Sequence, residues 1–430
     1  MYEEVKGKRI LFLGAIRALC EAVKMAKEMG MYTIVIDYLP DSPAKKVADK
    51  AYLVSTTDVD AVVELCKKEK VDGIFTAFTD SMLPYARKIC DKLNMPFYAS
   101  EEQIKLSLDK HFFKQTCERN EVPVPQDYTA QIKAIGTQDG TNINYPVIVK
   151  PIDSSGGRGV RICNTNAEFE KAYEYALSVS PSKNVLVEEC VIGDEVTATY
   201  TMKNGEISLS CLKDKLLSED HENITSQSDV LIMPSRYLSQ YLEKTDDKVK
   251  AMLKSLKATD GTVFLQSIAT EDKIKFFECG YRINGACDYR HIERENGINY
   301  LKMMLAHSVT GEMLGYDLSM DNPMFSRYIL TFNLWAHAGK IGYQKGLEET
   351  LNLPNVSFAE YMHEIGDVLL DNNTLFQRAF RAIIIDSDID RIKQTIKAIQ
   401  KAVVINDENG ESMLYKEFNV DRLNKYKKEI

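Results

Sequence analysis

The sequence predicts a protein of mixed class, with an α/β region first and α+β regions behind it. Two patterns carry this prediction. Short apolar runs alternate with amphipathic helical patterns over the first hundred residues, and short strands dominate from about residue 105 to about residue 311. The chain has 430 residues, of which 44% are hydrophobic and 27% are charged. These values are typical of folded globular domains and argue against disorder, collagen and a long coiled coil.

The first hundred residues follow a strand, helix, strand order that repeats, which is typical of a doubly wound parallel sheet. The expected strands are residues 8–14, 32–36, 51–55 and 73–77, and the expected helices are residues 15–29, 59–68 and 83–93. In such a sheet the carboxyl ends of the strands form a binding crevice.

A dinucleotide site is one interpretation of this crevice, because Asp37 follows Gly14 by 23 residues, near the place of a ribose-binding acid. The glycine pattern argues against it. A pyrophosphate turn needs Gly-x-Gly-x-x-Gly, and here Ile16 and Leu19 stand at the second and third glycine positions. A dehydrogenase is therefore a disfavoured alternative.

Composition changes after the front region, and we place a domain boundary near residue 105. The stretch 100–120 is charged and helical, residues 136–146 form a polar loop, and residues 147–150 form a strand. The chain ends with an isoleucine-rich amphipathic helix that starts near Ser387 or Asp388. The predicted domains are residues 1–105, 106–311 and 312–430.

The net charge and the cysteine content limit the classes of function that are possible. The chain has 63 acidic and 54 basic residues, a net charge of −9, which argues against nucleic acid and anionic membranes as partners. The apolar run 10–16 ends at Arg17 and is too short to span a membrane. Nine cysteines, with no Cys-x-x-Cys spacing, favour reduced thiols, and we expect a cytoplasmic protein.

Lys150 stands at the end of a predicted strand, a few residues before a loop that contains Gly156, Gly157 and Gly159. Such a loop can offer backbone N–H groups to phosphate oxygens while the lysine neutralises charge. A glycine-rich hairpin turn is the alternative, and the residues alone leave both open. A P-loop is excluded because the loop lacks Gly-Lys-Ser/Thr and a strand follows it.

Two further segments carry oxygen ligands. A strand at residues 185–189 runs into Glu188, Glu189 and Glu195, which could face an adenine edge and a ribose or could form a solvated edge. Two adjacent strands near residues 261–282 would place Gln266 beside Glu278, with Arg282 on the same face. Oxygen ligands beside an arginine suit Mg²⁺ bound to phosphates, and the alternative is the polar face of a surface sheet.

In this order the three segments resemble the ATP-grasp superfamily, which includes the carbamoyl-phosphate synthetase large chain, biotin carboxylase and L-amino-acid ligases. The resemblance extends over nearly the whole chain. It implies a Rossmann-like pre-ATP-grasp domain, then an ATP-grasp fold, then a C-terminal α+β lobe. The implied cofactors are ATP and one or two Mg²⁺ ions, with Mn²⁺ as an alternative metal. The implied partners are a small-molecule carboxylate and an amine, with a homodimer as an allowed assembly.

The resemblance also implies the roles of single residues. It places Lys110 and Lys150 on the nucleotide phosphates, and residues 154–160 in the flap over them, with contacts from Ser154, Ser155, Gly156, Gly157 and Gly159. The adenine would be bound at Glu188, Glu189 and Val191, and the ribose at Glu195. Gln266 and Glu278 would bind the metal, Arg282 would contact the acyl phosphate, and Arg282 and Lys150 would be the catalytic residues.

The chain departs from the superfamily pattern Glu-x-Asn-x-Arg at Gly280, which has no side chain to bind a second metal ion. The leading hypothesis is an ATP-dependent carboxylate–amine ligase that works through an acyl phosphate. A nucleotide-binding protein without ligase activity is the alternative that Gly280 motivates. By position alone, residues 213–236, including His221, Ser226 and Arg236, are expected to line the acceptor pocket.

Overall fold

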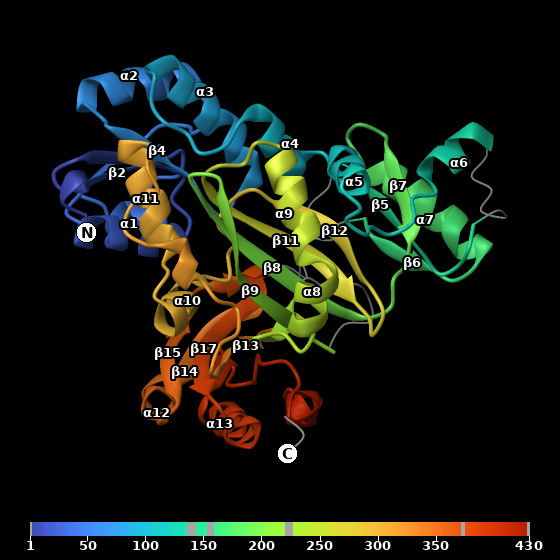
Figure 1. Ribbon diagram of the computed structural model, residues 1–430. Coiled ribbons are helices and arrows are strands. Elements are labelled where there is room, and N and C mark those ends of the chain that lie inside the picture. The colour runs from blue at the N-terminus through green and yellow to red at the C-terminus, as the bar shows by residue number, and fades with distance from the viewer. Residues whose placement is uncertain (1, 136–142, 153–158, 220–226, 371–374, 428–430) are drawn as a thin grey trace.

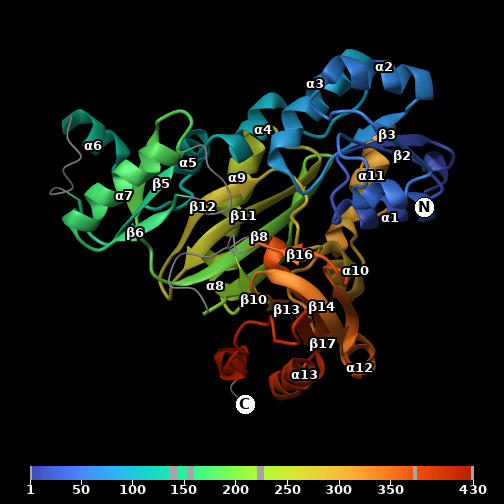
Figure 2. The same cartoon turned by 180° about the vertical axis from the view of Figure 1, so that it is seen from behind.

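The computed structural model describes residues 2–135, 143–152, 159–219, 227–370 and 375–427. The front region, a small lobe, a central sheet and a C-terminal region are visible in Figure 1 and, from behind, in Figure 2. The small lobe stands away from the other parts and is joined to the front region through α4 and α5. The mixed α/β and α+β class predicted from the sequence is confirmed.

The front region is a four-stranded parallel sheet in the order β3-β2-β1-β4, as predicted. Its elements are β1 (Arg9–Leu13), α1 (Leu19–Glu28), β2 (Tyr32–Asp37), β3 (Lys50–Leu53), α2 (Val59–Glu69), β4 (Gly73–Phe75) and α3 (Leu83–Leu93). The apolar residues of β1 and β4, and those of β2 after Tyr32, are buried on both faces, which is the pattern of a parallel sheet covered by helices, whereas the edge strand β3 is more exposed.

One helix that covers this sheet comes from far along the chain. α11 (Tyr300–Thr310) packs against β1, β4 and α1, and it shares a hydrophobic core with them. At Gly73 the helix comes so close that an added Cβ would lie 1.8 Å from the carbonyl oxygen of Ser308. Through α11, the chain that follows β12 of the central sheet packs against the front region.

The charged helical stretch predicted at residues 100–120 is helical, and it consists of two helices. α4 (Glu101–Leu108) and α5 (Lys110–Arg119) are separated at Asp109, whose backbone is extended with φ −124°. The Asp109 carboxylate accepts hydrogen bonds from the first N–H groups of α5, which makes Asp109 a good N-cap. The break turns α5 toward the small lobe (Figure 1).

The small lobe is a three-stranded antiparallel sheet in the order β6-β5-β7, with two helices packed against it. Its elements are α6 (Thr129–Ile135), β5 (Val147–Pro151), β6 (Arg161–Cys163), α7 (Asn166–Val179) and β7 (Val185–Glu189).

The centre is an eight-stranded sheet in the order β12-β11-β8-β9-β10-β13-β17-β15. Its strands are β8 (Asp194–Lys203), β9 (Glu206–Leu217), β10 (Ser228–Met233), β11 (Gly261–Ala269), β12 (Ile274–Gly280), β13 (Tyr328–Trp335), β15 (Val356–Tyr361) and β17 (Arg378–Asp386). All of its neighbouring strands are antiparallel. The sheet continues across the predicted boundary at residue 311, and the three domain ranges stay predictions.

The remaining elements flank this sheet. They are α8 (Leu238–Lys244), α9 (Asp246–Ser255), α10 (Tyr289–Asn296), β14 (Gly339–Lys345), α12 (Leu347–Leu351), β16 (Val368–Leu369), α13 (Ile389–Ala402) and β18 (Val404–Asp407). The isoleucines of α13 are buried against the C-terminal strands, and the side chain of Asp388 caps the helix, in agreement with the predicted amphipathic helix.

Candidate functional site

Lys150 lies near the end of β5 and forms an ion pair with Glu188 of β7. The register pairs Ile148 with Glu188, so Lys150 and Glu188 are diagonal neighbours on one face of the small sheet. Both side chains are largely buried, with 11% of Lys150 and 2% of Glu188 exposed. The structure thus brings together two residues that the sequence placed in one site.

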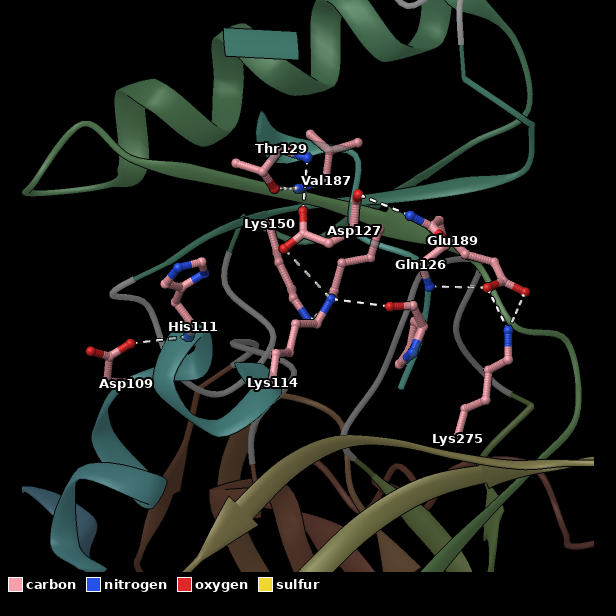
Figure 3. A network of polar contacts seen from close by, with 12 residues as sticks. Asp109, His111, Lys114, Gln126, Asp127, Thr129, Lys150, Val187, Glu189 and Lys275 are labelled. Atoms are coloured by element: carbon pink, nitrogen blue, oxygen red, sulfur yellow. Dashed lines mark hydrogen bonds and ion pairs between the residues drawn. The ribbon is translucent and has the colours of Figure 1, made fainter. Parts of the chain in front are cut away.

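A second lysine completes this group, and the sequence reasoning missed it. Lys114 of α5 also forms an ion pair with Glu188, and its side chain is only 4% exposed. Its Nζ donates a hydrogen bond to the carbonyl oxygen of Pro125 at 3.3 Å and lies 3.9 Å from the Asp127 carboxylate. Figure 3 shows Lys114 and Lys150 approaching from opposite sides of this network. The one available signal was its spacing, one helical turn after Lys110.

The two lysines set the charge of Glu188. Burial opposes ionisation of this carboxyl group, but the adjacent ammonium groups of Lys150 and Lys114 outweigh burial and lower its pKa. Glu188 is therefore ionised at neutral pH. Its single charge cannot balance two lysines, and Asp127 is a more distant and more exposed partner. The group therefore suits an additional anion, as the triphosphate of a nucleotide would be.

Glu189 points to the other side of β7. Its carboxylate accepts hydrogen bonds from Lys275 of β12 at 2.6 Å and from the backbone N–H of Gln126 at 3.1 Å (Figure 3). Partial burial opposes its charge, but Lys275 and Gln126 lower its pKa. Glu189 thus links the small lobe to the central sheet. Val191 is half-buried and lies two residues after the end of the strand.

The structure describes only some of the other predicted phosphate contacts. Lys110 is the first residue of α5, one turn before Lys114. Ser154, Ser155, Gly156 and Gly157 lie outside the described residues. Gly159 has φ +82°, and an added Cβ would lie 2.6 Å from Cγ of Pro151, so the end of the loop returns closely onto β5.

Gln266 and Glu278 are directly opposite each other on β11 and β12, as predicted. The Gln266 amide donates a hydrogen bond to Glu195 at 3.3 Å, and Lys215 donates to the same carboxylate at 2.8 Å. Glu278 is exposed on this face. Glu278 and the Gln266 carbonyl can offer oxygen ligands to one Mg²⁺ that also binds phosphate oxygens, so these residues fit one ion.

The position of the missing asparagine is filled. Gly280 lies directly opposite Phe264, and an added Cβ would meet Cε1 of the Phe264 ring at 2.2 Å. The Arg282 guanidinium stacks over the same ring at 5.0 Å. An aromatic ring therefore occupies the space beside Arg282, and the residues present do not fit a second metal ion there. Within the described part of the chain, no cluster of three His, Cys, Asp or Glu residues could hold a metal.

Arg282 is anchored to the front region. It forms an ion pair with Asp80 at 2.5 Å, while its buried Nε has no hydrogen-bond partner among the residues that the structure describes. Of the expected acceptor residues, Arg236 pairs with Asp194 at 2.5 Å, and His221 and Ser226 lie outside the described residues.

These features match known proteins. A family model described as the ATP binding domain of the carbamoyl-phosphate synthase L chain matches residues 109–245. A second, described as the PylC-like N-terminal domain, matches residues 10–94. Together the two models match residues at the front and in the middle of the chain, and the resemblance to ATP-grasp proteins that the sequence indicated is confirmed.

The particular relatives are diverse. The carbamoyl phosphate synthase large chain of Clostridium beijerinckii is 22% identical over 391 residues, 86% of this chain and 34% of that protein. The L-amino acid ligase of Bacillus licheniformis superposes with a TM-score of 0.76 at 15% identity, over 94% of this chain and 99% of that one. The biotin carboxylase domain of Hydrogenobacter thermophilus 2-oxoglutarate carboxylase, solved with MgADP and bicarbonate, gives 0.74 at 20% identity, over 95% and 91%.

The chain spans about a third of the length of the carbamoyl phosphate synthase relatives that it matches. All nine cysteines are free thiols. In the residues that the structure describes, no helix has the length and apolar character needed to cross a membrane.

Proposed function

We propose that this protein is an ATP-dependent carboxylate–amine ligase that forms an amide or peptide bond through an acyl phosphate and releases ADP and phosphate. The observation that carries the proposal is the buried group of Lys114, Lys150 and Glu188, which lies within the segment that matches an ATP binding domain. Two buried lysines that share Glu188, with Asp127 only as a more distant partner of Lys114, favour the binding of a further anion.

The roles are those that the resemblance to ATP-grasp proteins implies. Lys150 and Lys110 bind the phosphates, Glu195 binds the ribose, and the chain at Glu188, Glu189 and Val191 binds the adenine. Gln266 and Glu278 hold one Mg²⁺, which when bound neutralises phosphate charge and polarises the transferred phosphoryl group.

Arg282 stabilises the charge that develops on the activated carboxylate. Its guanidinium is held by Asp80 and Phe264, so it needs no reorganisation during the reaction. The buried ion pairs keep the site ordered, and catalysis is chiefly positioning plus electrostatic stabilisation.

A nucleotide-binding protein without ligase activity is the second candidate, and Phe264 favours it. The ring fills the place of a metal ligand in the superfamily pattern, so only one Mg²⁺ is held by side chains. We favour the ligase because a nucleotide-binding protein has little physical need for a fixed Arg282. Mn²⁺ in place of Mg²⁺, a homodimer and a cytoplasmic location also belong to the proposal.

The test uses hydroxylamine in place of the unknown amine. Purified protein is incubated with ATP, Mg²⁺ and a panel of carboxylates, and the hydroxamate is measured by its colour with ferric ion. The ligase predicts ATP-dependent hydroxamate from at least one acid and none with Lys150→Ala. ATP binding with no hydroxamate from any acid would favour the second candidate.

A further inference from the structure

A β-bulge in β17 brings two arginines to the same face of the central sheet. Arg381 is opposite Asn333 and Arg378 is opposite Trp335, and the register shifts between these pairs so that Ala379 is the extra residue. Residues three apart in a regular strand point to opposite faces, but the bulge turns Arg378 back to the face of Arg381. Their partners Asn333 and Trp335 are two residues apart on β13 and therefore also lie on one face, which agrees with this placement of the two arginines.

Three neighbouring cations already have carboxylate partners. Arg381 pairs with Glu360 at 2.5 Å, Arg290 of α10 pairs with Glu21, and Lys213 pairs with Asp288. The guanidinium groups of Arg290 and Arg381 both lie against the ring of Phe358, at 5.2 and 5.6 Å, so these pairs belong to one cluster.

Arg378 is different. Among the described residues it has no carboxylate within ion-pair distance, and its buried Nε has no hydrogen-bond partner. Burial and the neighbouring Arg381 lower its pKa to about 10, so the group is still charged at neutral pH. A buried guanidinium without an anion is unfavourable, and a carboxylate that binds it in the bidentate fork geometry would relieve the cost.

The same face also has unsatisfied acceptors. The side-chain oxygens of Asn333 and Thr331 are buried, since each residue is only 2% exposed, and they have no hydrogen-bond partner in the described part of the chain. The amide nitrogen of Asn333 is used, because it donates to the carbonyl oxygen of Ser228 at 2.9 Å. Among the described residues, β17 thus carries two arginine Nε donors without a partner, and the paired strand β13 carries two acceptors without one.

We propose that this face is a binding site for a small molecule that carries both a carboxylate and an amino group, of the α-amino acid class. The carboxylate binds Arg378 and Arg381, and the ammonium donates hydrogen bonds to Asn333 and Thr331. A simple monocarboxylate would leave the acceptors unsatisfied, and a phosphate monoester would bring no ammonium. That this molecule is a substrate of ligation rests on the proposed function; the binding itself does not.

Binding is measured by isothermal titration calorimetry without ATP. The probes are the free α-amino acids, acetate and propionate as plain carboxylates, and methyl phosphate as a different oxyanion. We expect at least one amino acid to bind, and to bind about tenfold or more tightly than either plain carboxylate. If no amino acid binds, or if methyl phosphate binds as tightly, the assignment is wrong.

The variants are Arg378→Gln and Arg378→Lys. Arg378→Gln is expected to weaken amino-acid binding by about tenfold to a hundredfold, and Arg378→Lys, which keeps the charge without the fork, by less. The matched control is Arg391→Gln, because Arg391 lies on the exposed side of α13 and pairs with Asp386 at 3.0 Å. Wild-type amino-acid affinity in either folded Arg378 variant would overturn the proposal.

The hydroxamate assay separates this inference from the proposed function. Amino-acid binding that depends on Arg378, without hydroxamate from any acid, would keep the site and remove the ligase. Hydroxamate formation by wild type, with amino-acid binding that is unchanged in folded Arg378→Gln, would keep the ligase and remove the site.

Discussion

The small lobe and the β11–β12 edge of the central sheet differ in the charged groups that they can hold. At the small lobe, Lys114 of α5 and Lys150 of β5 both form ion pairs with Glu188, so two positive charges are buried there. At the β11–β12 edge, Phe264 fills the space beside Gly280, so a place for a cation is closed. This difference supports the proposal of a nucleotide site that has lost one of its metal ligands.

The largest effect is expected at Lys150. Lys150→Ala should abolish measurable ATP binding, because one fixed charge on the phosphates commonly contributes ~3 kcal/mol, about a hundredfold. The fold should survive, because Glu188 keeps Lys114 as a partner. ATP affinity is measured by calorimetry, with Lys340→Ala as a control because Lys340 pairs with Glu408 on the exposed surface. Normal affinity in folded Lys150→Ala would remove the phosphate assignment.

At the sheet edge, Glu278→Gln tests the remaining metal ligand. It should lower Mg²⁺-dependent turnover about a hundredfold, while ATP binding weakens only modestly because the lysines are unchanged. The measurement is a Mg²⁺ titration of carboxylate-stimulated phosphate release. If turnover and its Mg²⁺ dependence stay normal, the metal lies elsewhere.

Lys114→Met tests whether the ion pair of Lys114 with Glu188 stabilises the fold. Removing one partner of the buried Glu188 should destabilise the protein by up to about 3 kcal/mol at neutral pH. The pKa of Glu188 is lowered in the folded protein, so its contribution is present above the unfolded-state pKa and is lost as pH falls through the folded-state pKa.

Denaturant unfolding at several pH values checks the sign of this effect. The difference between wild type and Lys114→Met should be largest near pH 7 and should shrink below about pH 4. A difference that grows on acidification would contradict the lowered pKa.

A smaller effect is expected at Gly280. Gly280→Asn should cost about 1–3 kcal/mol, because its side chain meets the Phe264 ring. The double variant Phe264→Ala/Gly280→Asn should cost less than the sum of the single changes, because removing the ring makes room. Additive costs in a denaturant-unfolding cycle would mean that Phe264 does not fill this space.

Local patterns predicted the front region well. The strand and helix at residues 73–77 and 83–93 are found as β4 and α3, because alternation and helical periodicity lie within short segments. The break at Asp109 was missed, since a charged helical pattern runs through it and only the capping geometry shows where α5 begins. That eight strands form one sheet depends on long-range pairing, which no local pattern contains.

Some residues of the candidate site could likewise be predicted from local sequence patterns, and others could not. Lys150 could be found because it precedes a glycine loop, and the pairing of Gln266 with Glu278 followed from two adjacent strands. Lys114 resembles an ordinary helix-surface lysine until the small lobe is placed against it. Phe264 could not be found, because its position opposite Gly280 depends on the register of the hairpin.

The measurement that tests the account most directly is phosphate release from ATP at saturating Mg²⁺ across a broad panel of amino acids and small acids. A ligase with a reduced metal site predicts that at least one acid stimulates release by wild type and by Lys340→Ala, but not by Lys150→Ala. A flat response across the panel, with ATP shown to bind, would contradict the ligase and leave a nucleotide-binding protein.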